Sequence, residues 1–527
     1  MLTVSGVSGP AHASMCGSHV VRVTADKVGA FSDADCRLFY VDPTSSAPST
    51  VRPAGNVPPV GNLSDAFALH SRPGAGSIIY LDFDGFTWGP GTWWDTTYPA
   101  VVANLEGRVS PGFDRNGDPT TFTPNERQDI IQIWAEDFAV FDVDVTTEVP
   151  TGASLDTFNR SGSYGLFLSD TDLQIACGCG GVAYVGVVTN PATPEKRPAL
   201  IHTKFNGAVT QNWDIEEIAA HEIGHNFGLV HDGTSTIEYY SGGANWAPIM
   251  GSGRGAGIVT WSAGGYPDSM TRGSQYSVDD FATIAQYANL IPDVVGDSVA
   301  TAADGTLDGS NVVINGLINS AADKDVYRLV VPPGSAGSWT VNVNSVSPQP
   351  NLDPELVLMD AAGNPISVSN PLVASGRQFG AIQTGLDATL TFNASPGTYY
   401  VSIDGVGQGS LSAGTGYSDY GSVGNYQLEV RTQTPGTAII ISGFNLAQIR
   451  SVRVAGADVS RFTLTPAGEI LTSVPMGAGI GPIEVTDARG VTHPSGTIFN
   501  ARNAPVAPVI ETISDRAPAE SQAVTVT

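Results

Sequence analysis

One segment near the middle of the chain constrains the fold more than any other, because three of its histidines must meet. It reads His221-Glu222-Ile223-Gly224-His225-Asn226-Phe227-Gly228-Leu229-Val230-His231-Asp232. On a helix, residues four apart share a face, so His221 and His225 can direct both imidazoles at one metal ion, with Glu222 beside them. Gly228 ends the helix, and the sharp turn that glycine permits brings His231 back as a third nitrogen ligand.

Three neutral imidazoles with an open fourth position form the donor set of a catalytic zinc ion, whereas structural zinc sites are closed and rich in thiolates. Zinc lowers the pKa of its bound water to about 7, and Glu222 would take up the proton and pass it to a leaving amine. A bare His-Glu-x-x-His also occurs by chance on surface helices. Here the third histidine and the helix-ending glycine agree with the motif, and three of the chain's 8 His lie in this segment. The sequence therefore predicts a zinc site.

Helix and strand signals surround the zinc motif. Capping residues indicate three helix starts: Thr123 with Pro124 and Glu126, Asp214 with Glu217, and Ser277. Apolar residues at helical spacing follow the first start as far as Phe141, and the other two helices are predicted to end near Phe227 and residue 290. Strands are predicted over 78–83, 142–149, 164–169, 181–188 and 198–205.

From about residue 296 the sequence pattern changes to short stretches of alternating apolar and polar residues, separated by Gly, Pro, Asn and Asp. The whole chain has 61 Gly and 35 Pro, which marks many turns. We find no convincing helix signal in this part, and a boundary is indicated near 433–436. The predicted fold is multidomain: an α/β (α+β) domain with the zinc motif, followed by all-β sandwich-like domains.

The net charge argues against several classes of partner. The chain has 24 Lys and Arg against 51 Asp and Glu, a formal net charge of −27. Nucleic acids and anionic membranes would repel such a chain. No apolar run approaches the roughly 18 residues of a membrane helix. The first residues, with a weakly apolar stretch from Leu2 to Val7, resemble a poor or clipped signal peptide.

The four cysteines fall in two local pairs, Cys16 with Cys36 and Cys177 with Cys179. An even number in local pairs suits disulfides in an oxidising compartment, so we expect a secreted or extracellular protein. Cys177 and Cys179 form either a local disulfide or bonds to separate partners, because no second thiol pair completes a tetrahedral metal site.

The zinc motif resembles that of the metzincin zinc endopeptidases, whose pattern is His-Glu-x-x-His-x-x-Gly-x-x-His with a Met-turn downstream. Met250, within Trp246-Ala247-Pro248-Ile249-Met250-Gly251, supplies the Met-turn. The resemblance implies that Met250 lies beneath the zinc ion and is not a ligand. Some metzincins carry a tyrosine ligand two residues after this methionine, but Ser252 stands there, so no such tyrosine is assigned.

Further sequence segments, spread over roughly residues 69–291, resemble the reprolysin-like, bacterial secreted type of metzincin. The segment Gly181-Val182-Ala183-Tyr184-Val185-Gly186 resembles the edge strand along which a substrate peptide lies. Metzincin zymogens can also use a pro-segment cysteine as a removable zinc ligand. Cys16 is the candidate for that role, although a disulfide with Cys36 would silence its thiolate.

One loop has the spacing of a calcium site. Asp114, Asn116 and Asp118 place oxygen atoms at the first, third and fifth positions of a calcium loop, but Pro119 stands where the loop's glycine belongs. A calcium loop and a plain Asx-rich turn both fit this segment. Asp293, Asp297, Asp323 and Asp325 likewise suit either a calcium site or a solvated edge.

The β-rich part resembles two known modules. Asp323-Lys324-Asp325-Val326-Tyr327 is typical of a pre-peptidase C-terminal domain, and Ile441-Ser442-Gly443-Phe444-Asn445 of an immunoglobulin-like module of the IPT/TIG type. The resemblances imply roles in secretion, stabilisation or adhesion. The predicted parts are an N-terminal signal or pro-region with linker (1–60), the metzincin-like domain (61–295), the pre-peptidase-like domain (296–432), the IPT/TIG-like domain (433–505) and the start of a truncated domain (506–527).

The sequence thus predicts a secreted zinc metalloendopeptidase that acts on proteins or peptides, with zinc as its metal and calcium as one of the two alternatives for the acidic segments. It does not span a membrane or bind nucleic acid. The alternative from another class is a surface adhesin whose metzincin-like domain is silent and whose β-domains bind a cell surface or matrix. Zinc-dependent hydrolysis of something other than peptides uses the same ligands and stays open.

Overall fold

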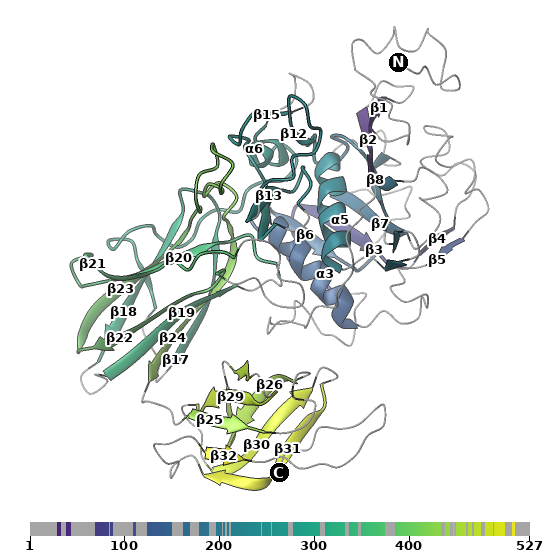
Figure 1. Ribbon diagram of the computed structural model, residues 1–527. Helices are drawn as coiled ribbons and strands as arrows, with labels where there is room; N and C mark the ends of the chain where they lie inside the picture. Colours follow the sequence, from purple (N-terminus) through teal and green to yellow (C-terminus); the bar gives the residue numbers. More distant parts are fainter. Residues whose placement is uncertain are drawn as a thin grey trace, which may run out of the picture.

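The computed structural model shows a chain built mostly of β-sheets, with three helices among the residues that it describes (Figure 1). Those residues are 29–32, 38–43, 69–83, 85–87, 109–111, 124–149, 162–168, 179–188, 196–202, 204–205, 208–209, 212–243, 245–253, 256–271, 278–305, 311–332, 337–345, 349–374, 385–433, 438–442, 446, 449–459, 462–465, 468–475, 480–487, 490–500 and 509–511. The prediction of a β-rich chain with several sheets is confirmed.

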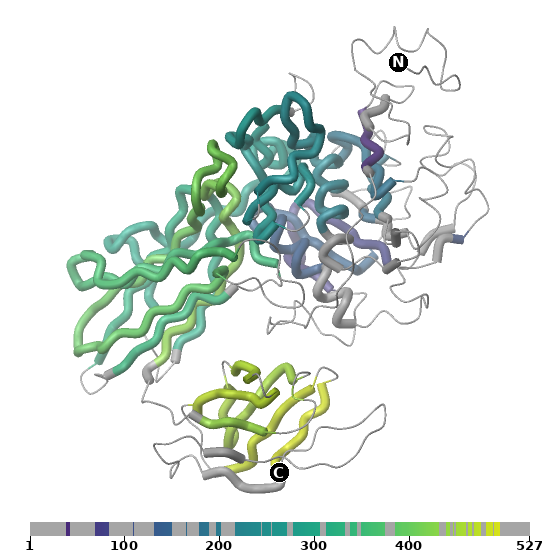
Figure 2. Tube along the Cα trace, in the orientation of Figure 1, coloured from purple at the N-terminus to yellow at the C-terminus, as the bar shows by residue number. Residues whose placement is uncertain are grey.

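The zinc motif lies against a sheet of seven strands. In spatial order they are β1 (Gly29–Ser32), β2 (Leu38–Pro43), β8 (Cys179–Tyr184), β9 (Pro198–His202), β7 (Gly162–Leu168), β3 (Ser77–Asp82) and β6 (Val143–Thr146). The strands from β9 to β6 run parallel, while β8 is antiparallel to β9 on one side and to β2 on the other. Figure 2 shows the purple β2 beside β8, although about 140 residues separate the two strands.

Two helices, α3 (Pro124–Asp137) and α5 (Asn212–Asn226), lie side by side against this sheet (Figure 1). The predicted apolar face of α3 is confirmed, since Ile131, Trp134 and Phe138 are buried in the main core. Helix α5 begins two residues before Asp214, so Asp214 lies inside the helix and does not precede it. Prediction from capping residues is least accurate at such boundaries.

After the motif the chain forms two short ladders. Strand β12 (Asp232–Thr234) pairs with β15 (Ser269–Thr271), and β13 (Trp246–Pro248) pairs with β14 (Ile258–Thr260). The two other short pairs are β4 (Gly85–Thr87) with β5 (Val109–Pro111), and β10 (Lys204–Phe205) with β11 (Ala208–Val209).

The predicted third helix is shorter than expected. Helix α6 runs only from Asp280 to Ile284, and its cap is Asp279 instead of Ser277. The Asp279 carboxylate accepts a hydrogen bond from the Ala282 backbone N–H, which stabilises a later helix start. The chain from Ala285 to Ala288 continues as turns.

Residues 303–433 form two packed sheets. The first is β16 (Ala303–Asp304), β18 (Lys324–Val331), β23 (Gly397–Gly405), β20 (Pro354–Met359) and β21 (Pro365–Ser369), and the second is β17 (Asn311–Ile318), β24 (Gly424–Gln433), β19 (Gly337–Ser345) and β22 (Ala388–Ala394). Alternating burial along β18 and β20 matches the two-residue period predicted from the sequence.

Two further sheets follow, with an apolar core of their own around Ile441 and Val454. One contains β28 (Thr463–Leu464), β29 (Ile470–Ser473), β25 (Ala438–Ile441) and β32 (Val509–Glu511), and the other β27 (Ala457–Asp458), β26 (Ile449–Val454), β30 (Ile480–Asp487) and β31 (Thr492–Asn500). In the part of the chain that the structure describes, no helix is long and apolar enough to cross a membrane.

The sheets of residues 303–433 pack directly on the α/β part. A single apolar cluster includes Trp261 and Phe138 of the α/β part together with Tyr426 of β24. Buried polar contacts join the same parts, because Glu136 of α3 accepts hydrogen bonds from Asn425. Helix α3, which lies beside the helix of the metal motif, therefore packs against the first pair of β-sheets.

Candidate metal centre

Helix α5 and the turn after it bring the three histidines together. His221 and His225 lie one helical turn apart, and Gly228 ends the helix with a φ of 96°, in the left-handed region that favours glycine. The Gly228 N–H donates to the His225 carbonyl at 2.8 Å, and the chain then reverses toward His231. The ring centroids of the three histidines lie 4.9–5.2 Å apart. The structure therefore brings His221, His225 and His231 close together.

Each imidazole is held by a hydrogen bond from its outer nitrogen. The Nδ1 of His221 donates to the Ile249 carbonyl at 2.9 Å, and that of His225 to the Leu229 carbonyl at 2.9 Å. The Nδ1 of His231 lies 3.3 Å from the Glu238 carboxylate. With the proton on Nδ1, each Nε2 carries a lone pair, and such bonds are the usual way of orienting a metal-ligating histidine.

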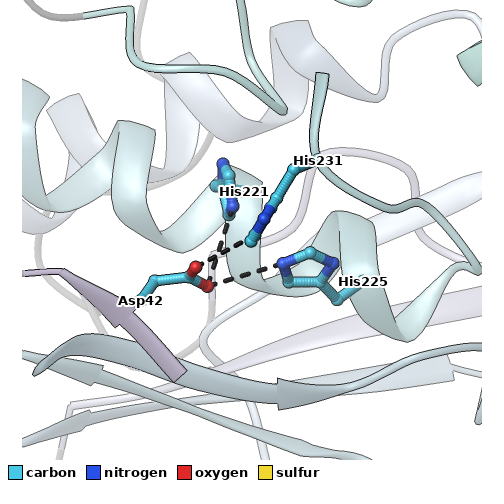
Figure 3. Close-up of side chains that lie close together, drawn as sticks. All are labelled: Asp42, His221, His225 and His231. Atoms are coloured by element: carbon cyan, nitrogen blue, oxygen red, sulfur yellow. Dashed lines mark ion pairs between the residues drawn. The ribbon is translucent and has the colours of Figure 1, made fainter. Parts of the chain in front are cut away.

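The Nε2 atoms converge on one point, and a carboxylate lies there (Figure 3). Asp42 Oδ1 is 2.9 Å from His231 Nε2, and Asp42 Oδ2 is 3.5 Å from His225 Nε2 and 3.7 Å from His221 Nε2. All four side chains are buried. Lone pairs that face one another in a buried space repel unless a cation lies between them, so this donor set fits zinc.

Burial sets the charge of two of the ligands. It lowers the pKa of His221 to about 3 and also lowers the pKa of His225, which keeps both imidazoles neutral and ready to bind a metal. Burial lowers the pKa of His231 as well, but the carboxylates of Asp42 and Glu238 outweigh it and raise that pKa. Burial raises the pKa of Asp42, and the nearby histidines, His231 most of all, hold it well below its usual range.

The predicted base, Glu222, lies fully buried beside the first ligand on α5. Burial, followed by the charge of Asp42, raises its pKa well above the usual value for a glutamate. Gly181 of β8 leaves the space that this side chain needs, because a Cβ at Gly181 would lie 2.0 Å from Glu222 Oε1. The base is thus enclosed between α5 and the predicted substrate strand.

Met250 packs against α5 at Gly224. It is fully buried, and a Cβ at Gly224 would lie 2.6 Å from its Sδ atom. Its carbonyl accepts a hydrogen bond from the Asp232 N–H at 2.9 Å, which ties the turn to the residue after the third histidine. Met250 is therefore a packing partner of the metal helix.

Two residues at the site were missed from the sequence. Asp42 falls in the segment interpreted as a linker after the N-terminal region, and nothing local marks it as a metal-site residue. Tyr239 lies eight residues after the third histidine. Its hydroxyl donates a hydrogen bond to Asp42 Oδ1 at 2.5 Å, and its ring centroid is 4.3 Å from that of His231. A tyrosine thus lies at the site, but at another position than the one considered after Met250.

Other predicted residues lie apart from the site or outside the described residues. The candidate calcium residues Asp114, Asn116 and Asp118 are outside them, as are Cys16, Cys36 and Cys177. Cys179 is buried in β8 and disulfide-bonded. Of the four acidic residues near the first β-sheets, Asp293, Asp323 and Asp325 lie together.

A sequence comparison adds the class of protein. Residues 154–262 match the reprolysin-type model of metallo-peptidase family M12. This segment contains the three histidines, Glu222 and Met250. The match and the donor set together support a zinc-dependent metallopeptidase, a hydrolase. No curated protein matches the chain significantly.

Two solved structures show a distant likeness to this chain. The pre-peptidase C-terminal domain of a collagenase from Bacillus anthracis is 20% identical, with 25% of this chain and 96% of that chain covered and a TM-score of 0.17. The periplasmic inhibitor PliG of g-type lysozyme from Aeromonas hydrophila is 16% identical, with 25% and 100% covered and a TM-score of 0.15. TM-scores this low do not define a shared fold, so the domain types expected for residues 296–505 stay predictions.

Proposed function

We propose that the chain is a secreted zinc metalloendopeptidase that hydrolyses peptide bonds of extracellular proteins. One observation carries the proposal: three buried imidazoles, each fixed through Nδ1, direct their Nε2 atoms at one point beside the buried Glu222. His221, His225 and His231 would hold the zinc ion. When bound, zinc supplies a Lewis acid that polarises the scissile carbonyl and acidifies water.

Glu222 would act as the proton carrier of the reaction. Its carboxyl group is buried one residue after the first ligand on the same helix, where it would take the proton of the attacking water. The same carboxyl group can then give that proton to the nitrogen of the leaving amine. Because Gly181 has no side chain, the carboxyl group of Glu222 fits between α5 and β8.

Strand β8 would bind the substrate peptide. One side of β8 pairs with β9, and on the other side, which β2 occupies in this structure, an extended peptide would add as a strand in place of β2. Backbone hydrogen bonds along this edge hold a peptide in register without regard to its side chains. Such binding suits an endopeptidase, since it holds the substrate peptide on both sides of the scissile bond.

Zinc dependence is the direct test of this function. We expect cleavage of unfolded casein to stop when a chelator removes zinc and to return when zinc is added. His225→Ala should lose both the bound zinc and the cleavage, since it removes one of the three nitrogens. Casein that stays intact with zinc-loaded protein, both before and after removal of residues 1–60, would contradict the proposal.

The alternative of a surface adhesin makes a different prediction. In that case the β-sheets after residue 296 would bind a cell surface or matrix by themselves, and the full chain would cleave nothing. The enclosed Glu222 favours the peptidase, because a silent domain has no need of a buried base. Secretion is proposed on the residues that suit an extracellular disulfide protein, among them the disulfide-bonded Cys179.

A further inference from the structure

His231 is the histidine of the metal motif that lies outside helix α5. The helix sets His221 and His225 one turn apart, whereas His231 follows the turn at Gly228 and belongs to no helix or strand. Residues on helices and strands are held more precisely than residues on loops, so the position of His231 depends on the segments packed beside it. Two such segments flank it: helix α6 with the turns that follow it, and residues 232–240.

The first segment packs on the turn that leads to His231. A Cβ at Gly228 would lie 3.3 Å from Thr283 Cγ2 of α6 and 2.8 Å from the Tyr287 ring. The side chains of Thr283 and Tyr287 therefore lie directly against the Gly228 backbone. Because close-packed interiors transmit displacements, a shift of α6 would move this turn and the histidine after it.

The second segment carries the hydrogen-bond partner of His231. Glu238, whose carboxylate faces His231 Nδ1, lies two residues before Tyr240. The Tyr240 N–H donates to the Asp232 carbonyl at 2.8 Å, and the Tyr240 ring stacks on that of Tyr266 with centroids 4.1 Å apart. The Tyr266 ring thus supports the segment that orients His231.

Both segments contact one loop of the first pair of β-sheets. This brace loop, residues 406–423, joins β23 to β24 and extends to α6 and β13 (Figure 1). The Tyr420 hydroxyl accepts a hydrogen bond from the Phe281 N–H at 2.9 Å and donates one to Asp279 Oδ1 at 2.7 Å. The rings of Tyr420 and Phe281 also stack, with centroids 4.7 Å apart. The brace loop therefore fixes the start of α6.

The middle of the brace loop packs on Tyr266. Tyr417 shares a buried apolar cluster with Tyr266 and Trp246. Leu411 and Tyr240 pack against this cluster. The brace loop thus supports the second segment as well, through the Tyr266 ring.

Hydrogen bonds hold the brace loop itself in one shape. Gln408 and Tyr417 exchange two backbone hydrogen bonds of 3.1 and 2.8 Å, and the Tyr417 hydroxyl donates to the buried Asp353 at 2.6 Å. The Asp353 N–H donates in turn to Ser422 Oγ at 2.9 Å. One buried residue at the start of β20 therefore fixes both the middle and the end of the loop.

We propose that the brace loop positions His231 and so sets the strength with which the site holds its metal. The proposal rests on the function proposed above, because it concerns the same three histidines. Tyr417 and Tyr420 are positioning residues, since each acts on His231 through other residues. The first pair of β-sheets is then a structural part of the metal site.

Zinc affinity tests this role without relying on catalysis. Tyr420→Phe keeps the stacked ring but loses both hydrogen bonds of the hydroxyl. We expect the full chain with this change to bind zinc about 2- to 30-fold more weakly in competition with a chelator. Tyr399→Phe is the matched control, because the Tyr399 hydroxyl accepts from the Ser395 N–H elsewhere on the same sheets, and it should leave zinc binding unchanged.

A second variant displaces the backbone of the brace loop. A Cβ at Gly421 would lie 2.3 Å from Thr260 Oγ1 and 2.5 Å from the Trp261 carbonyl oxygen. Gly421→Ala must therefore push the loop away from the α/β part. We expect it to weaken zinc binding at least as much as Tyr420→Phe, with the fold retained by circular dichroism.

A His231→Ala background separates positioning from a general loss of stability. Without this imidazole the loop has no third ligand to position, so Tyr420→Phe and Gly421→Ala should leave the residual zinc affinity unchanged. Equal losses of affinity in both backgrounds, or no loss in either, would overturn the proposal. If zinc affinity responds as expected but casein stays uncut, the proposed peptidase function fails while the positioning role stands.

Discussion

At the scale of single residues, the site divides into atoms that the sequence indicates and atoms that only the fold brings near. His221, His225, His231 and Glu222 follow from a spacing that a helix and a glycine turn convert into proximity. The hydrogen-bond partners of the histidines could not be predicted in this way. Ile249 and Leu229 contribute backbone carbonyls, which carry no sequence signal. Asp42 lies 179 residues before the first histidine, and no local pattern links residues so far apart.

The outer partner of His231 offers a residue-scale prediction. Glu238→Ala removes the carboxylate that accepts from the His231 Nδ1. Loss of such a partner frees the ring to rotate and typically weakens metal binding 10- to 100-fold. Competition with a zinc chelator should show a change of about that size, with the fold retained by circular dichroism. Unchanged zinc affinity would mean that His231 is oriented by other contacts.

Gly181 offers a second prediction, on catalysis. In Gly181→Ala the new Cβ would lie 2.0 Å from Glu222 Oε1, so the base must move. Because general bases contribute about 10²–10⁴-fold, we expect kcat to fall by at least about tenfold while bound zinc stays near one per chain. The measurement is kcat with zinc content on the same sample. A full kcat would show that Glu222 tolerates displacement.

At the scale of elements, local signals predicted some boundaries and not others. The start of α3 at Pro124 and the strands β3, β7 and β18 follow from capping residues and periodicity. The third helix was predicted too long, because apolar spacing continues after Ile284 where the chain forms turns instead. The pairing of β2 with β8 could not be predicted, since a strand's period shows which face is buried but not which strand lies beside it.

The turn after α5 allows a prediction on stability. Gly228→Ala places a side chain at a φ of 96° and 2.8 Å from the Tyr287 ring. The left-handed backbone alone costs about 1–2 kcal/mol, and the clash adds to it. Urea unfolding should show the lower free energy of unfolding. Adding Tyr287→Leu to the Gly228→Ala chain should relieve the clash but leave the backbone cost. Full recovery in the double variant would mean that the backbone strain is negligible.

At the scale of the whole molecule, the first pair of β-sheets is joined to the α/β part by buried polar contacts as well as apolar packing. Glu136 of α3 is 3% exposed and accepts hydrogen bonds from the backbone and side chain of Asn425. The change of texture near residue 296 predicted separate β-domains, but the common core could not be predicted, because the contacting residues lie far apart in the sequence.

The buried Glu136 gives this contact a pH dependence. Burial raises its pKa from 4.5 to about 7, so the folded chain holds a proton that the unfolded chain releases between those values. The stability that this proton contributes is full below about pH 4.5 and is lost as the pH rises through 7, a change of about 3 kcal/mol.

Glu136→Gln should remove that part of the pH dependence. A neutral amide in the same place needs no proton, so the variant should be more stable than the original chain above pH 7 and should lose less stability between pH 5 and 8. Thermal unfolding at several pH values measures this. A variant whose stability falls with pH as steeply as before would assign the dependence to other groups.

The central claim is that the site formed by the three histidines and Glu222 cleaves peptide bonds when it holds zinc. The most direct measurement is kcat/KM for unfolded casein, at equal zinc occupancy, for the original chain and for the same chain with Glu222→Gln. We predict a chelator-sensitive activity in the first that falls by about 10²–10⁴-fold in the second. Equal rates in the two zinc-loaded chains would contradict the claim.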